Sequence, residues 1–147
     1  MERIALYPGT FNPMTTGHLN IIKRASSLFD KVFVAIGRNS DKSCSVSDEE
    51  RYRAACRAVE GISNVKVVTY DCLTTDLCIK LGVSVIVRGI RSVADYEYER
   101  NIADINRLIA PGIETVCLFA DSRFSAVSSS MVRELQRYGK DVSDFIV

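Results

Sequence analysis

Residues 3–37, RIALYPGTFNPMTTGHLNIIKRASSLFDKVFVAIG, decide how this chain folds. The short apolar run at 3–7 favours a strand that Pro8-Gly9 ends. From 17 to 29, apolar residues recur with the spacing of a helix. The run at 31–37 is apolar almost throughout, which is typical of a parallel strand covered by helices on both faces. A strand, a loop, a helix and a second strand together form the repeating unit of a parallel α/β sheet.

The same alternation continues along the rest of the chain. Ser47, with Glu50 three residues later, is a capping-box pattern at a helix start. Further strands are predicted at 64–70, 83–89 and 114–120, and helices at 47–59, 75–81, 93–109 and from Ser128 or Ser129 to Arg137. Five strands alternating with helices predict an α/β protein, with a single-domain doubly wound Rossmann-like fold and a five-stranded parallel sheet over residues 1–147.

The composition fits one such domain and excludes several classes of protein. Of 147 residues, 47% are hydrophobic and 25% charged, which is enough apolar surface for one core. Lys and Arg together number 19 and Asp and Glu 18, so the charge balance predicts no surface for nucleic acid or an anionic membrane. Five cysteines without a CxxC pair and a single histidine do not match a zinc site. They are typical of reduced thiols in a cytoplasmic protein.

The uncharged stretch from 4 to 22 does not predict a membrane span. Prolines and glycines between 8 and 17 interrupt it, whereas a spanning helix needs about 20 unbroken apolar residues. The N-terminus MERIALYPG also lacks the apolar run and the cleavage site of a secretory signal. We therefore expect a cytoplasmic protein.

The loop between the first strand and the first helix has the composition of an anion site. Gly9 and Gly17 let a ligand approach the backbone closely, and threonines at 10, 15 and 16 supply hydroxyl donors. The free N–H groups of the following helix favour a phosphate, and His18 lies in its first turn. The loop has neither the Walker pattern nor GxGxxG, so phosphates must be held in another way. On position alone, His18 could instead be a structural or solvated residue at a helix start.

Four separated segments carry a resemblance to a known family. GTFNPMTTGH at 9–18 resembles the signature of the nucleotidyltransferase superfamily with (H/T)xGH after the first strand. Lys42 after the second strand, VIVRGIRSVADYEYE at 85–99 and FSAVSSS at 124–130 narrow the match. In identity and spacing they are similar to the phosphopantetheine adenylyltransferase family, over nearly the whole chain. Asn12 departs from the family pattern, which has aspartate there, and so removes a charge near the loop.

The resemblance implies an activity and a set of site residues. The activity is transfer of the adenylyl group of ATP to 4'-phosphopantetheine, giving dephospho-coenzyme A and pyrophosphate by direct attack without a covalent enzyme intermediate. Catalytic roles fall to His18, Lys42 and Arg91, and His18 stabilises charge at the α-phosphate. The 4'-phosphopantetheine substrate is implied at Thr10, Lys42, Thr74 and Arg88. The residues implied for ATP are Thr10, Phe11, His18, Gly89, Ile90, Arg91, Glu99, Phe124, Ser125, Ala126, Val127, Ser128, Ser129 and Ser130.

Cofactor and partners follow from the same resemblance. No carboxylate cluster resembles a metal site, so no protein-held metal is predicted and Mg²⁺ is expected to arrive with ATP. The partners are ATP and 4'-phosphopantetheine, with coenzyme A as an optional feedback ligand, and neither nucleic acid nor a membrane is among them. The family typically forms homohexamers, and we expect the same assembly here.

Several of these residues also have simpler explanations. Lys42 could be a solvated surface charge, and the serines at 128–130 could only cap a helix. Arg91 could pair with Asp95 or Glu99 on the following helix. Two other functions stay open: another small-molecule adenylyl- or cytidylyltransferase, acting on nicotinate mononucleotide or glycerol phosphate, and a non-catalytic ATP-binding module. A second anion pocket beside the nucleotide would favour the enzyme.

Overall fold

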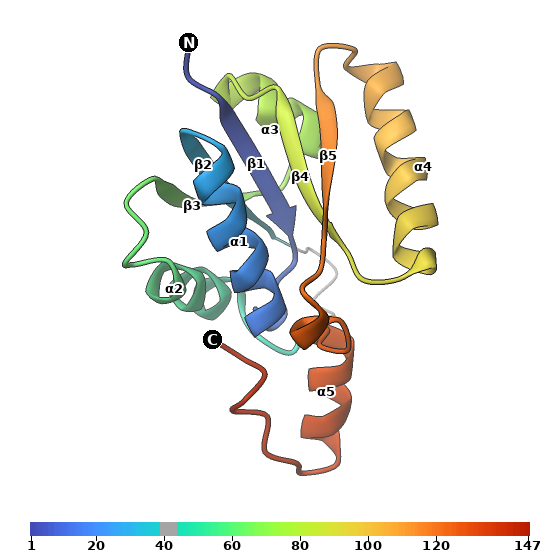
Figure 1. Cartoon of the computed structure of the whole chain (residues 1–147). Coiled ribbons are helices and arrows are strands. Elements are labelled where there is room, and N and C mark those ends of the chain that lie inside the picture. Colours follow the sequence, from blue (N-terminus) through green and yellow to red (C-terminus); the bar gives the residue numbers. More distant parts are fainter. Residues whose placement is uncertain (39–43) are drawn as a thin grey trace.

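The computed structural model describes residues 1–38 and 44–147, and its elements alternate as predicted (Figure 1). Lys42, a predicted catalytic residue, lies outside the described residues. The strands are β1 (Ile4–Gly9), β2 (Lys31–Gly37), β3 (Val65–Tyr70), β4 (Val85–Ile90) and β5 (Glu114–Phe119). The helices are α1 (Thr16–Leu28), α2 (Asp48–Ala58), α3 (Thr74–Leu81), α4 (Val93–Ile109) and α5 (Ser129–Arg137), with a 3-10 turn η1 (Ser122–Phe124) before α5.

The sheet is parallel throughout, with the strand order β3-β2-β1-β4-β5. The order reverses at β1, because the chain runs outward to β3 before it crosses back to β4. β1 pairs with β2 as far as Gly9 opposite Ile36, but with β4 only at Ala5 and Leu6. In doubly wound sheets, the carboxyl edge at such a reversal is where ligands bind. The predicted fold class is confirmed.

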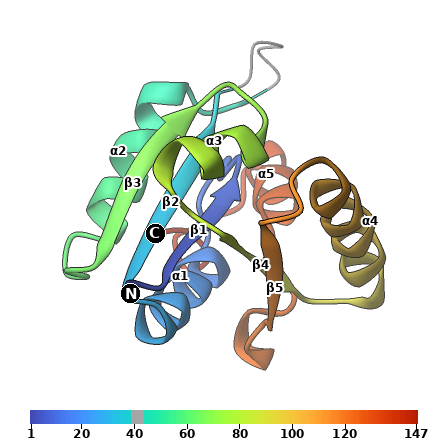
Figure 2. The ribbon, with the colours of Figure 1, turned by 90° about the horizontal axis from the view of Figure 1, so that it is seen from above.

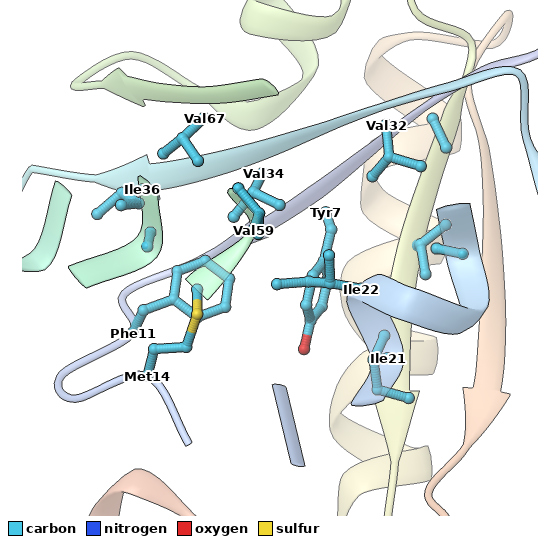
Figure 3. Close-up of a cluster of buried hydrophobic side chains, with 14 residues drawn as sticks. Tyr7, Phe11, Met14, Ile21, Ile22, Val32, Val34, Ile36, Val59 and Val67 are labelled. Atoms are coloured by element: carbon cyan, nitrogen blue, oxygen red, sulfur yellow. The ribbon is translucent and has the colours of Figure 1, made fainter. Parts of the chain in front are cut away.

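Two apolar clusters attach helices to opposite faces of the sheet (Figure 2). On one face, Val34 belongs to a cluster with Ile22 of α1 (Figure 3). Ala55 of α2 belongs to the same cluster. On the other face, Leu6 packs with Leu77 of α3. Neighbouring residues of a strand point to opposite faces of the sheet. Because helices cover both faces, the central strands are apolar throughout.

The structure moves two predicted strand boundaries by two residues: β4 starts at Val85 and not at 83, and β1 ends later than predicted. β1 continues through Pro8 and Gly9, where the sequence predicted its termination. A proline has no N–H to donate, but its fixed φ is compatible with the last residues of an extended strand. The β1–α1 loop therefore starts two residues later than predicted.

In α4, the apolar residues at 98, 102, 105 and 109 recur with helical spacing as an apolar stripe, which predicts the helix correctly, but most of this stripe does not cover the sheet. Tyr98, Ile105 and Ile109 are each more than half exposed, whereas Glu99 on the same helix is buried. The buried side of α4 thus carries a carboxylate and the half-buried Ile102, whereas most of the large apolar residues of the helix face outward.

After α5 the chain returns to the beginning of α1. The N–H of Thr16 donates to the carbonyl of Phe145 at 2.9 Å, and Thr15 forms an antiparallel bridge with Ile146. The final residues of the chain therefore pack against the first turn of α1, next to His18 in sequence.

Candidate active site

Loops after β1, β4 and β5 converge at the carboxyl edge of the sheet and line a cavity of about 330 Å³, the first cavity. Residues at the N-terminus of α5 also line this cavity. The helix lies beyond the end of β1 (Figure 1). Of the residues predicted to bind ATP, its walls contain Thr10, Phe11, His18, Gly89, Arg91, Glu99, Phe124, Val127, Ser128, Ser129 and Ser130. The fold thus brings into one cavity residues that are far apart in the sequence.

Three residues predicted for ATP do not line the first cavity: Ile90, Ser125 and Ala126. Ile90 follows Gly89 on β4, and neighbouring strand residues point to opposite faces. Ser125 and Ala126 lie in the turn between η1 and α5, where the Ser125 hydroxyl donates to the carbonyl of Ser122 at 3.1 Å. The predicted contact of these three residues with ATP therefore has no support in the lining of the first cavity.

A second cavity, of about 390 Å³, adjoins the first on the face of the sheet that α3 and α4 cover. Thr74 lines it, and the Thr74 hydroxyl lies 3.1 Å from the hydroxyl of Tyr70. The residues that line both cavities are Pro8, Gly9, Thr10, Arg88 and Glu99. Thr10, Thr74 and Arg88, all predicted for 4'-phosphopantetheine, therefore border one space beside the predicted nucleotide cavity.

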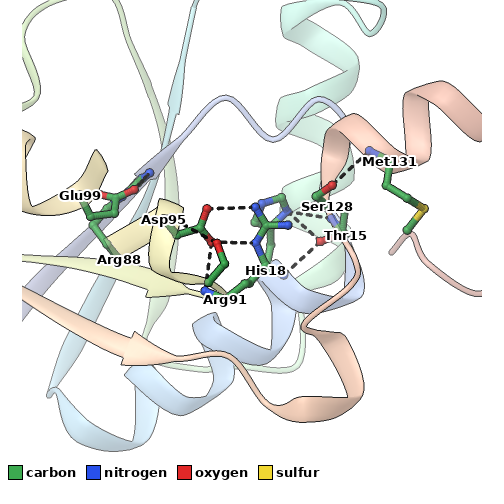
Figure 4. A network of polar contacts seen from close by, with 9 residues as sticks. Thr15, His18, Arg88, Arg91, Asp95, Glu99, Ser128 and Met131 are labelled. Carbon is green, nitrogen blue, oxygen red and sulfur yellow. Dashed lines mark hydrogen bonds and ion pairs between the residues drawn. The ribbon is translucent and has the colours of Figure 1, made fainter. Parts of the chain in front are cut away.

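Thr15 and His18 form a reciprocal cap at the start of α1 (Figure 4). Thr15 Oγ1 accepts from the N–H of His18 at 3.2 Å, and the N–H of Thr15 donates to His18 Nδ1 at 2.9 Å. Because Nδ1 accepts that bond, the proton of the neutral imidazole is on Nε2. Burial lowers the pKa of His18 to about 4, and Arg88 and Arg91 add repulsion. In the free protein at neutral pH, His18 is therefore a neutral Nε2–H donor in the wall of the first cavity.

Phe11 holds the imidazole from the side. Its ring packs edge-to-face on His18, with centroids 5.0 Å apart, and on Tyr7 at 5.4 Å. Its φ of 52° is left-handed, a conformation that costs a non-glycine residue about 1–3 kcal/mol. The ring also lies against Gly9, where a Cβ would come within 2.9 Å of it. The absence of a side chain at Gly9 is thus what allows Phe11 to reach His18.

Arg88 and Glu99 form the wall between the two cavities. Nε and one Nη of Arg88 donate to the two carboxylate oxygens of Glu99 at 2.8 and 2.7 Å. The other Nη donates to the carbonyl of Pro8. A guanidinium has five N–H donors, so these three bonds leave two for a ligand. The side chain of Arg88 is 27% exposed, which keeps it accessible from the cavities.

Arg91 combines the two roles considered from the sequence. It lines the first cavity, and its Nε donates to the carboxylate of Asp95 at 3.1 Å (Figure 4). The backbone N–H of Arg91 donates to the same carboxylate at 3.0 Å. An ion pair this exposed contributes little to stability, so Arg91 can exchange Asp95 for an anionic ligand at small cost.

The triple serine both caps α5 and lines the first cavity. Ser128 Oγ accepts from the N–H of Met131 at 3.1 Å, so the capping explanation holds. The Ser129 hydroxyl donates to the carbonyl of Pro13 at 2.7 Å, which attaches α5 to the β1–α1 loop. Helix N-termini favour anions through their free N–H groups and partial positive charge. This end of the first cavity is therefore suited to phosphate groups.

Arg133, which the sequence analysis did not select, adds a further positive charge to the first cavity. It donates to the carbonyl of Asn12 at 2.7 Å and to the hydroxyl of Ser130 at 3.3 Å. Its spacing of three residues from Ser130, one helical turn along α5, was the available signal.

Asn12 is structural, and its neutral side chain suffices for that role. Asn12 Oδ1 accepts from the N–H of Val46 at 3.0 Å and from the hydroxyl of Ser45 at 3.2 Å. An amide oxygen accepts hydrogen bonds as a carboxylate does, so replacing the family's aspartate leaves both contacts possible. The residue ties the β1–α1 loop to the segment before α2.

Arg51 is a second residue that sequence reasoning missed. Its side chain is fully buried beneath the loops, although it lies in a highly charged stretch of the sequence. One Nη donates to the carbonyls of Thr10 and Gly37 at 2.8 and 2.9 Å, and Nε to that of Val46 at 3.3 Å. The other Nη pairs with Asp48. Arg51 therefore ties the end of β1 to the end of β2.

Acidic groups do not form a cage for a metal ion in the first cavity. The carboxylates that line it, Asp95 and Glu99, are both bound to arginines. Within 1–38 and 44–147, no group of three His, Cys, Asp or Glu residues is arranged to hold a metal ion. A divalent cation would have to bring most of its oxygen ligands with it.

Comparison with known proteins gives a consistent result. The family model described as cytidylyltransferase-like matches residues 6–135. A phosphopantetheine adenylyltransferase of Porphyromonas gingivalis is 46% identical over 145 residues, which cover 99% of this chain and 94% of the relative. Proteins of the same name from Bacteroides thetaiotaomicron and Leptospira biflexa are 44% and 43% identical, over 98% of this chain and 95% and 90% of theirs.

A solved structure supports the fold independently. It is a candidate nicotinate-nucleotide adenylyltransferase from Vibrio parahaemolyticus, which superposes with a TM-score of 0.76 at 19% identity. The match covers 100% of this chain and 88% of the other.

Proposed function

This chain belongs to the phosphopantetheine adenylyltransferase family, and we propose that its two adjoining cavities hold ATP and 4'-phosphopantetheine for direct adenylyl transfer. A phosphate oxygen of 4'-phosphopantetheine attacks the α-phosphorus of ATP. The bond from that phosphorus to the bridging oxygen breaks, and pyrophosphate leaves with the electron pair. The products are dephospho-coenzyme A and pyrophosphate. The single observation that carries this proposal is the wall of Thr10, Arg88 and Glu99 that both cavities share.

ATP is assigned to the first cavity because of its chemistry. Gly89 lines this cavity at the end of β4, and the N-terminus of α5 offers N–H groups and serine hydroxyls to phosphates. Arg91, just before α4, and Arg133 of α5 add positive charge to this cavity. The departing pyrophosphate would thus meet donors already in position, which is how proteins accelerate phosphoryl-type transfer.

The acceptor is assigned to the second cavity. Arg88 and Thr10 border both spaces, so a phosphate held by them from the second cavity lies next to the α-phosphate of a nucleotide in the first. The remainder of 4'-phosphopantetheine, an extended chain with amide groups, would run between α3 and α4 past Tyr70 and Thr74. We retain Lys42 as a further phosphate ligand on the family pattern alone.

His18 acts as a hydrogen-bond donor to the α-phosphate. Its Nδ1 is occupied by the N–H of Thr15, which leaves Nε2–H for the ligand. A neutral donor of fixed direction stabilises negative charge that develops on the phosphate oxygens, without needing to give up its proton. Phe11 and the cap of α1 keep the ring in place, so little reorganisation is needed during the reaction.

Magnesium would enter as a complex with ATP. The first cavity supplies carboxylates only from Asp95 and Glu99, which are paired with arginines, so phosphates and water would supply most ligands of the ion. When bound, the ion supplies charge neutralisation on the phosphate groups.

The remaining proposals concern assembly and place of action. Exposed apolar residues on α4 and β5, among them Leu108 and Phe119, support the homohexamer expected from the family. A coenzyme A molecule has a nucleotide and a pantetheine arm, so both cavities could accept it as a feedback ligand. The five cysteines are free thiols, which supports action in the cytoplasm. The described residues include no helix long and apolar enough to cross a bilayer.

One assay tests the proposed function against its rivals. Purified protein is incubated with ATP and magnesium plus 4'-phosphopantetheine, nicotinate mononucleotide or glycerol phosphate, and pyrophosphate release is followed. We expect release with 4'-phosphopantetheine only, and CTP should not replace ATP. Release with another acceptor would reject the substrate assignment, and ATP binding without release under any condition would indicate a non-catalytic module.

A further inference from the structure

We propose that Tyr7 is a nucleotide-binding residue, whose phenolic hydroxyl donates a hydrogen bond to an oxygen of ATP in the first cavity. This inference rests on the proposed function, since it assigns a further contact to the same nucleotide. Tyr7 stands on β1, just before the segment that resembles the superfamily signature, and was not among the predicted site residues.

The Tyr7 hydroxyl is a nearly buried polar group without a partner in the protein. The residue is only 5% exposed and lines the first cavity. Within 1–38 and 44–147, the Tyr7 oxygen takes part in no hydrogen bond. In the same residues, every fully buried side-chain nitrogen or oxygen has a hydrogen-bond partner, so the Tyr7 oxygen is not fully buried. The hydroxyl must therefore keep contact with the open space of the cavity. Buried hydroxyls are almost always hydrogen-bonded, so this one is placed to meet a ligand.

The position of the ring directs the hydroxyl to the floor of the cavity. The ring packs edge-to-face on Phe11, with an interplanar angle of 72°, and lies beside Ile22 (Figure 3). The hydroxyl oxygen is on the side of Ile21, which itself lines the cavity (Figure 3). Ile21 in turn lies against Gly89 of β4, where a Cβ would come within 3.2 Å of it. The hydroxyl thus reaches the space between the ends of β1 and β4.

The surroundings suit a donor to an anionic or polar oxygen. Burial raises the pKa of Tyr7 to about 12, and the positive charges of Arg88 and Arg91 oppose that rise while Glu99 adds to it. The phenol therefore remains protonated at physiological pH. A ligand that replaces water at this hydroxyl must accept a hydrogen bond from it. Arg88 and Arg91 line the same cavity as Tyr7, so an anionic oxygen of the nucleotide could bind next to the hydroxyl.

The substrate that Tyr7 contacts follows from the side of the strand on which it lies. Tyr7 packs in the cluster beneath α1, whereas its neighbour Leu6 packs in the cluster beneath α3. Tyr7 lines the first cavity and does not line the second. The contact is therefore with the nucleotide rather than with 4'-phosphopantetheine.

The test is Tyr7→Phe, which removes the hydroxyl and leaves the ring on Phe11. We expect the KM for ATP, and the ATP dissociation constant by calorimetry, to rise on the order of ten- to a hundredfold, as when a hydrogen bond to a charged group is lost. The KM for 4'-phosphopantetheine and the melting temperature of the ligand-free protein should not change. Tyr138→Phe, at a tyrosine 71% exposed after α5, is the matched control and should behave as wild type.

Each other outcome overturns the inference. Unchanged ATP affinity in Tyr7→Phe would mean that the hydroxyl contacts only water. A lowered melting temperature without loss of ATP affinity would assign the hydroxyl to the protein's own packing, and an effect confined to 4'-phosphopantetheine would assign it to the other substrate. Calorimetry with ATP alone keeps this test separate from the proposed function: a wild type that releases no pyrophosphate rejects the function, while the ATP affinities of the two proteins still decide the role of Tyr7.

Discussion

Glu99 holds Arg88 by two parallel hydrogen bonds, of 2.8 and 2.7 Å, at the wall that the two cavities share. The carboxylate is almost fully buried on α4, and the guanidinium is partly open to the cavities. A bidentate pair fixes the plane of the guanidinium, which sets the direction of its two remaining N–H donors. In the proposed function, the carboxylate therefore acts on the acceptor phosphate through the arginine.

Glu99→Gln should therefore weaken binding of 4'-phosphopantetheine. An amide supplies one oxygen instead of two, so the guanidinium loses its fixed plane, and we expect the KM for 4'-phosphopantetheine to rise about tenfold with a lower melting temperature. Steady-state kinetics with each substrate varied, together with thermal denaturation, measure both effects. Glu97→Gln, at an exposed residue of the same helix, is the control. Wild-type KM values in Glu99→Gln would contradict the positioning role.

Replacement of His18 should separate donation to the phosphate from capping of the helix. In His18→Asn, the side-chain oxygen can still accept from the N–H of Thr15, but the Nε2 donor is gone. We expect kcat to fall on the order of 100- to 1000-fold with ATP affinity nearly unchanged. His18→Gln, whose amide reaches as far as Nε2, should retain more activity than His18→Asn. Equal kcat in wild type and His18→Asn would exclude the donor role.

The lowered pKa of His18 predicts how stability depends on pH. The imidazole titrates near 6.5 in the unfolded chain and at about 4 in the folded protein. Between these values the unfolded state binds the extra proton, so the free energy of unfolding should be highest above pH 6.5 and fall toward pH 4, by no more than about 3 kcal/mol. Denaturant titrations of wild type and His18→Asn at pH 7, 6 and 5 measure this, and identical pH slopes would contradict it.

Arg51→Lys should loosen the ends of β1 and β2. A lysine ammonium cannot reach the four acceptors that the guanidinium satisfies, so a buried carbonyl is left unpaired at a cost of about 1–3 kcal/mol for each lost bond. Because the carbonyl of Thr10 is one of these acceptors, we also expect a higher KM for 4'-phosphopantetheine. Arg53→Lys, at an exposed partner of Glu49 on the same helix, should change stability by less than about 0.5 kcal/mol. Equal melting temperatures for the two variants would refute the expectation.

Gly9→Ala should act on catalysis through two aromatic neighbours. The new Cβ would come within 2.9 Å of the Phe11 ring, which must shift and so release the imidazole of His18. We expect a loss of kcat of tenfold or more, since small displacements of catalytic groups are costly. Gly61→Ala is the control, because a Cβ there meets nothing within 4 Å. Wild-type kcat in Gly9→Ala would show that Phe11 does not position His18.

The fold was predictable because its signals are local. The near-continuous apolar character of 31–37 and the helical spacing at 17–29 each indicate one element, and their alternation fixes a parallel sheet. The end of β1 was misjudged because Pro8 and Gly9 usually interrupt strands, whereas here they form its last two residues. Whether the apolar stripe of α4 faces the sheet depends on tertiary packing. The sequence therefore did not reveal that most of this stripe is exposed.

The candidate site was predictable only where residues stand in a motif. Thr10, His18, Arg88 and the serines at 128–130 meet at one edge of the sheet, as the loop order implied. Arg51 was missed because its sequence surroundings are charged, and only the tertiary structure buries it among carbonyls. The pairing of Arg88 with Glu99 also depends on how α4 crosses β4, which a single sequence does not specify.

The contact between residues 145–147 and the first turn of α1 has a practical side. The carbonyl of Phe145 accepts a hydrogen bond from the N–H of Thr16, two residues before His18, the proposed donor to the α-phosphate. A purification tag fused behind Val147 would lie close to that turn and could displace it. A resulting change in turnover could then be mistaken for a property of the protein itself. Met1 is fully exposed at the opposite edge of the sheet (Figure 1), so affinity handles and surface immobilisation belong there.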